Sequence, residues 1–77
     1  MIINAAIRKD GIIYTGKCHA EIINNQSRGF FRNCEQGFVD DKGEFFNRGD
    51  AAQIAFNCGQ IRYPKTELFS EDIWRKD

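Results

Sequence analysis

Histidine is almost absent from this chain: His19 is the only one among 77 residues. Metal sites and acid–base catalysis usually need a histidine supported by carboxylates or by other histidines. Cys18 and Glu21 are close to His19 in the chain, but their spacing does not put three ligands on one helix face. Cys18 would also point away from its neighbour on a helix, which argues against a nucleophile–base pair. The sequence therefore predicts no metal site, no cofactor and no enzyme.

Net charge is lacking as well, because eleven basic and eleven acidic residues cancel. No long-range field would then draw the protein to nucleic acid or to an anionic membrane. We expect neither of these as a partner, and any partner must be recognised through local contacts.

Cysteine pairs and long apolar runs are missing too. Three cysteines, an odd number at wide spacing and without a C-x-x-C pair, predict no disulfide scaffold and no zinc or redox motif. No run approaches the roughly 18 apolar residues of a membrane span, and residues 1–4 do not resemble a signal peptide. We expect one domain over residues 1–77 in a reducing cytoplasm.

Apolar and aromatic residues are what the chain does have. Apolar residues make up 42% of it, and seven residues are phenylalanine. Large rings bury much area at low backbone cost, which suits a small domain. We therefore expect a core made of a few large rings.

A hairpin followed by a helix is predicted in the first third of the chain, over about 3–26. Asp10-Gly11 between two apolar runs is a strong turn signal, with strands near 3–8 and 12–15. Thr15 or Gly16 can then cap a helix over roughly 17–25, which ends in the polar residues 24–27.

The same order of elements is predicted again over about 37–60. Strands at 37–40 and 44–46 flank a turn that ends in Gly43. Asn47 is a good N-cap for a helix that runs to about Cys58, and Gly59 suits its C-terminal cap. The apolar stripe of this helix comprises Ala51, Ala52, Ile54, Ala55 and Cys58.

Two such units can join their strands into one antiparallel sheet with both helices on a single face. This predicts an α+β fold, a two-layer sandwich, although the sequence identity between the units is too low to establish a duplication. In the C-terminal segment, 61–77, residues 70–72 can begin a last helical turn that carries Ile73 and Trp74. Residues 28–33 fit a loop or an irregular strand.

The predicted helix starts offer backbone N–H groups and cations, which suit an anion such as phosphate or carboxylate. Lys17 and His19 stand at the first start, and Arg48 at the second. Gly16-Lys17 has the context of a phosphate loop but none of its longer pattern. His19 itself fits a structural hydrogen bond, a ligand contact or a catalytic role.

Two aromatic clusters allow more than one interpretation. Rings and charges alternate over residues 28–32, which fits a nucleic-acid stacking platform, a core contact or an oligomer contact. The end of the chain, with Phe69 and Trp74, fits a partner anchor or a cover for the core. The acidic pairs at 40–41 and 71–72 fit turn and cap residues better than paired general acids.

A longer pattern runs through the second half of the chain. It begins with residues 36–40 and continues at Gly43, Phe46, Arg48, Ala51, Ala52, Ile54, Ala55 and residues 59–61. It ends with Leu68 and residues 70–74. This pattern resembles a family of small phage-encoded proteins of unassigned function, and it covers about half of the chain.

The resemblance implies a phage or prophage origin and a bacterial host, but no reaction. Members of the family carry paired histidines ahead of the first helix, where this chain has Cys18 and His19. The chain departs from the family at this point, so the resemblance does not carry over a two-histidine site.

A small phage protein without catalytic residues can act by stoichiometric binding. The first hypothesis is counter-defence, in which the protein sequesters a nucleotide-like anion through Lys17, His19, Gln36, Arg48 and Gln60. The alternative is a protein–protein inhibitor of a host or defence protein, which would use Phe30, Phe31, Phe69 and Trp74. A third reading, a nucleotide enzyme, would rest on His19 with Glu71 or Asp72. A homo-oligomer is compatible with each.

Overall fold

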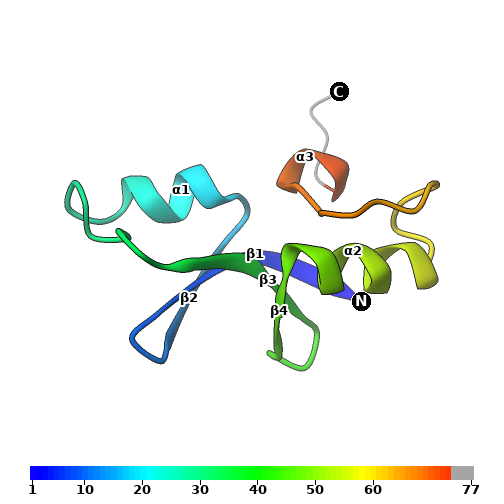
Figure 1. Ribbon diagram of the computed structural model, residues 1–77, viewed down its shortest axis with the longest axis horizontal. Coiled ribbons are helices and arrows are strands. Elements are labelled where there is room, and N and C mark those ends of the chain that lie inside the picture. Colours follow the sequence, from blue (N-terminus) through cyan, green and yellow to red (C-terminus); the bar gives the residue numbers. More distant parts are fainter. Residues whose placement is uncertain (74–77) are drawn as a thin grey trace.

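The structure, a computed structural model, describes residues 1–73 and has a four-stranded sheet with helices on one face (Figure 1). Its strands are β1 (Ile2–Lys9), β2 (Ile12–Gly16), β3 (Glu35–Asp40) and β4 (Phe45–Asn47). Its helices are α1 (His19–Asn24), α2 (Arg48–Asn57) and α3 (Ser70–Ile73). The strand order β2-β1-β3-β4, antiparallel throughout, joins the two hairpins through β1 and β3. The predicted α+β, two-layer fold is confirmed.

Both predicted hairpins are present, and their turns have the backbone that the sequence requires. Asp10 and Gly11 have φ angles of 53° and 79°, so both central residues of the first turn are left-handed. Such a turn matches the twist of the strands, and Lys9 pairs with Ile12 across it. In the second hairpin, Gly43 has a φ angle of 80° at the end of the turn.

The first helix is shorter than predicted, and its caps are different. α1 starts at His19 and ends at Asn24, with Cys18 as its N-cap. The expected cap residues, Thr15 and Gly16, instead belong to β2, where they pair with Ala6 and Ala5 of β1. Sheet pairing therefore wins over helix formation at these positions.

The second helix agrees with the prediction at both ends. The Asn47 side chain accepts a hydrogen bond from the N–H of Asp50 at 2.8 Å, and Gly59 follows the helix with a φ angle of 81°. Ala51, Ala52 and Ala55 are fully buried. Cys58 is exposed, so its inclusion in the apolar stripe was wrong, because the helix ends one residue before it.

The core lies between the sheet and the helices, and it is built from small and aliphatic side chains rather than from several rings. Its buried members are Ile2, Ala5, Ile7, Ile22, Phe38, Ala51, Ala52, Ala55 and Leu68. Phe38 is the one phenylalanine among these buried members, and the rings of Tyr14, Phe31 and Phe46 pack against them, so the expected large rings lie mostly at the edge of the core. Three alanines on one face let the backbone of α2 approach the sheet closely, which leaves room for few rings.

The other phenylalanines lie around this core or across the sheet from it. Phe46 packs against the edge of the core. The ring of Phe45 lies against Gly37, where an added Cβ would come within 2.8 Å of it. The guanidinium of Arg8 lies 4.6 Å from the centre of the Phe45 ring and makes three hydrogen bonds to the Glu35 carboxylate. This face of the sheet is thus partly covered by its own side chains.

A membrane-crossing helix would need a long apolar stretch, and no helix within residues 1–73 has one.

Candidate functional site

His19 is the centre of a polar cluster in which the first helix meets the sheet and the C-terminal segment. It is buried, and its ring lies edge-on to Phe38. Nε2 lies 2.8 Å from the carbonyl oxygen of Gly37, which can only accept, so Nε2 carries the proton. Nδ1 is then an acceptor, and it lies 3.4 Å from both the Arg48 Nη2 and the Ser70 Oγ.

Arg48 extends this cluster along the C-terminal segment. Its Nη2 donates to the Gln36 Oε1 at 2.7 Å, and its Nη1 donates to the carbonyl of Leu68 at 2.9 Å. The guanidinium also lies 4.9 Å from the centre of the Phe69 ring. Three of the predicted ligand residues, His19, Gln36 and Arg48, are therefore brought together, and they bind one another and the backbone.

The environment of His19 favours its neutral form. Burial is the main cause that lowers the pKa of His19 below its usual value of 6.5, and the positive charge of Arg48 acts in the same direction. The hydrogen bond to Gly37 opposes this shift only in part. The ring thus serves as a neutral hydrogen-bonding link between elements.

The other two predicted ligand residues lie apart from this cluster. Lys17 is exposed, two residues before α1. Gln60 follows α2 at the end opposite to Arg48, and its side chain makes a double hydrogen bond to Ile2, with both donor–acceptor distances at 2.8 Å. Gln60 therefore ties the end of α2 to the first strand.

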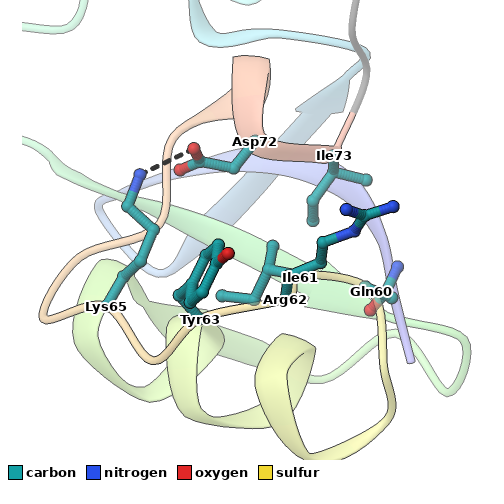
Figure 2. Close-up of a pocket in the computed structure, with 7 residues that line it drawn as sticks. All are labelled: Gln60, Ile61, Arg62, Tyr63, Lys65, Asp72 and Ile73. Carbon is teal, nitrogen blue, oxygen red and sulfur yellow. Dashed lines mark hydrogen bonds and ion pairs between the residues drawn. The ribbon is translucent and has the colours of Figure 1, made fainter.

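An open cleft of about 790 Å³ lies between α3 and the loop after α2. It is lined by residues 60–63 and Lys65 of the loop, and by Asp72 and Ile73 of α3. Figure 2 shows Tyr63 and Ile61 between Lys65 and Arg62, with Lys65 reaching Asp72 and Arg62 extending toward Ile73 of α3. The Lys65 Nζ lies 2.6 Å from the Asp72 Oδ1.

The two aromatic clusters differ in their surroundings. Phe30 and Phe31 are half-buried and pack edge-on against each other and against Tyr14 of β2, so these rings form a local cluster. Phe69 is 43% exposed, between the cations of Arg48 and Lys65. Trp74 lies outside the described residues.

The acidic pairs take up the turn and cap roles expected of them. The Asp40 Oδ1 accepts from the N–H groups of Glu44 and Lys42, which lowers the pKa of the Asp40 carboxyl. The Asp72 Oδ2 accepts from the N–H of Phe69 at the start of α3. Within residues 1–73, no three His, Cys, Asp or Glu side chains are grouped as metal ligands.

Arg62, Tyr63 and Lys65 of the cleft were not predicted from the sequence. They lie in a segment without helical or strand periodicity, so no pattern placed them on a common face. The available signal was a tyrosine next to an arginine, two residue types that are enriched at protein–protein interfaces.

Among protein families, the one described as Phage T4 y16D protein matches residues 1–74 of the chain. The match therefore includes every helix and strand described above, as well as the second-half pattern. No curated protein and no solved structure matches the chain.

Proposed function

The chain belongs to the Phage T4 y16D protein family, and from this premise we propose that it acts by stoichiometric binding of an anionic, nucleotide-like small molecule. Such a protein would be a phage accessory factor in the host cytoplasm. It would work in counter-defence by sequestering a small signalling molecule that the host's defence requires, without converting it.

The cleft beside α3 is the observation that carries this proposal. Among the described residues, two cations, Arg62 and Lys65, line it, against the one carboxylate of Asp72. Its volume of about 790 Å³ lies in the range of small-molecule sites, which is roughly 300–1,000 Å³. Because the whole chain has zero net charge, such a local excess of positive charge is what an anion would recognise.

Binding without conversion is supported by the position of the one histidine. Its ring is buried, and both ring nitrogens face partners within the protein. The ring thus links elements of the fold, and it is poorly placed to exchange protons with a ligand.

Native mass spectrometry of the protein purified from an infected host tests the proposal directly. We expect a mass increment of nucleotide size, which denaturation releases as a small anion. The same spectrum reports whether the protein is a homo-oligomer. A protein without any small anion would contradict the proposal, and conversion of a nucleotide pool by the protein would point to an enzyme instead.

Charge-matched variants locate the site. Arg62→Ala with Lys65→Ala removes both cations of the cleft, and we expect the bound anion to be lost. Arg28→Ala with Lys42→Ala makes the same charge change at exposed positions elsewhere, and should retain it. Lys17→Ala tests the predicted start of the first helix. If only this variant lost the bound anion, the site would lie at that helix start instead of in the cleft.

A protein–protein inhibitor is the second candidate, and the exposure of two rings favours it. Tyr63 is 75% exposed and Phe69 is 43% exposed, and exposed aromatic residues near arginine are common interface anchors. This reading predicts a host polypeptide bound one to one, which Phe69→Ala releases. Phe56→Ala removes a ring that is 37% exposed on α2 and serves as the matched control.

A further inference from the structure

We infer that the cleft beside α3 binds a phosphate ester that carries an aromatic base, with Tyr63 as the stacking platform for the base. This inference rests on the proposed function and adds where the ligand sits and which of its groups are recognised. It assigns the site to Tyr63, Arg62, Lys65 and Asp72, rather than to the helix starts.

Tyr63 is the residue that points to an aromatic ligand. It lines the cleft and is 75% exposed, so most of its surface is open to solvent and to a ligand. Half-buried Ile61 and Ile73 supply apolar surface beside it. An exposed ring next to apolar walls is suited to stacking against a flat base, as in proteins that bind single-stranded nucleic acids.

The two cations are placed for a phosphate at either end of such a base. Figure 2 shows Lys65 on one side of Tyr63, while Arg62 extends toward Ile73 on the other. Arginine can bind a phosphate through two parallel hydrogen bonds, and lysine acts as a point charge. A base on Tyr63 would therefore bring its phosphate within reach of one of them.

The ion pair between Lys65 and Asp72 makes the site responsive to an anion. The Lys65 Nζ is 2.6 Å from the Asp72 Oδ1, and the two side chains are 38% and 20% exposed. Because the lysine end of the pair is open to solvent, where ion pairs contribute little to stability, a phosphate can replace the carboxylate on Lys65. Asp72 thus acts as an internal competitor of the ligand.

Asp72→Asn separates this role from the structural one. Asp72 also accepts a hydrogen bond from the Phe69 N–H through Oδ2 at 2.9 Å. An asparagine can still accept that bond, but it carries no negative charge. We therefore expect the variant to fold and to bind an anion more tightly than the wild-type protein does.

Isothermal titration calorimetry with the 5′-monophosphates of adenosine, guanosine, cytidine and uridine tests the inference. We expect at least one of them to bind at least tenfold more tightly than its nucleoside and than inorganic phosphate. Tyr63→Ser should weaken this binding about tenfold, Tyr63→Phe should preserve it, and Asp72→Asn should strengthen it several-fold. Phe56→Ser, which removes a ring outside the cleft, should leave the affinity unchanged.

Several results would overturn the inference. These are the absence of binding by all four monophosphates, phosphate binding as tight as nucleotide binding, and full affinity in Tyr63→Ser. If native mass spectrometry still releases a small anion in any of these cases, the proposed function stands and only the ligand class or place is wrong. If no anion is released either, both the proposed function and this inference are wrong.

Discussion

The imidazole of His19 joins three parts of the chain through one ring. Its Nε2–H binds the Gly37 carbonyl in β3, while Nδ1 faces Arg48 of α2 and Ser70 of α3. Protonation of Nδ1 would remove the acceptor and place a second positive charge beside the Arg48 guanidinium. The neutral ring is therefore the form that the folded state requires.

Because of His19, we expect the free energy of unfolding to decrease as the pH is lowered. The pKa of His19 is lower in the folded protein than its usual value of 6.5, so the unfolded chain binds the extra proton first. The contribution of His19 is complete above about pH 6.5, and it is lost as the pH falls below that value, by at most about 1.4 kcal/mol per pH unit. Urea unfolding at pH 7.5, 6.5 and 5.5 measures this loss.

His19→Gln is the control for this pH dependence. Glutamine can donate to Gly37 and accept from Arg48 without titrating, so the slope between pH 7.5 and 5.5 should flatten. The pKa of Asp40 is lowered from 3.8, so its own contribution is lost only at lower pH. An unchanged slope in the variant would show that another group titrates.

Gly37 is a position at which the packing leaves no room for a Cβ atom. A Cβ at this position would overlap the Phe46 carbonyl and the ring of Phe45, whereas a Cβ at Gly43 would meet open space at a φ of 80°. We expect Gly37→Ala to lower the free energy of unfolding by about 3 kcal/mol, and Gly43→Ala by only about 1 kcal/mol. Chemical denaturation of both variants checks the order, and equal losses would contradict it.

At the scale of elements, the two main helices begin in different ways. α2 has the side chain of Asn47 as a cap, while the N-cap of α1, Cys18, makes no side-chain hydrogen bond to the helix. The backbone of Cys18 nevertheless has the extended conformation of an N-cap, with a φ of −146°. Glu21 stands three residues later, so only a hydroxyl is missing from a capping box.

Cys18→Ser should therefore stabilise the protein, and Asn47→Ala should destabilise it. The serine can bind a free N–H of the first turn and raise the free energy of unfolding by about 0.5–1 kcal/mol, whereas loss of the Asn47 cap should cost about 1 kcal/mol. Thermal and urea unfolding measure both changes. Cys18→Ala controls for loss of the thiol, and a gain there would show that capping is not the cause.

At the scale of the whole molecule, the C-terminal segment both closes the core and presents a surface. Leu68 is fully buried in the core, and its backbone N–H binds the Arg48 carbonyl at 2.9 Å. Phe69, the next residue, is 43% exposed above Arg48. Leu68 therefore covers the core, whereas a partner contact through Phe69 stays a prediction.

Leu68→Ala and Phe69→Ala should separate these roles. Truncation of a buried leucine lowers the free energy of unfolding by about 2–5 kcal/mol, which is a large part of the stability of so small a domain. Removal of the exposed Phe69 ring should lower it by less than about 1 kcal/mol. Circular dichroism during urea unfolding measures both. A larger loss for Phe69→Ala would show that its ring supports the fold more than it serves a partner.

Elements whose structure depends on residues adjacent in the sequence were predictable from the sequence. Asp10-Gly11, Asn47 and Gly59 specify a turn, a cap and a helix end through their own backbone preferences, and each was found as predicted. The order of hairpin and helix, twice over, then sufficed for the α+β fold. Thr15 and Gly16 were misassigned because pairing with β1, a contact beyond the local sequence, competed with helix formation.

The sequence by itself determined both hairpin turns, the ends of the second helix and the fold class, since turn and cap preferences act over a few residues. Its second-half pattern also indicated a small phage-encoded protein family. Only the tertiary structure decided which side chains meet. His19, Gln36 and Arg48 come from separate elements, and the cleft combines a loop without periodicity with α3. Such contacts depend on the path of the whole chain, and propensities that act over one or two turns do not specify that path.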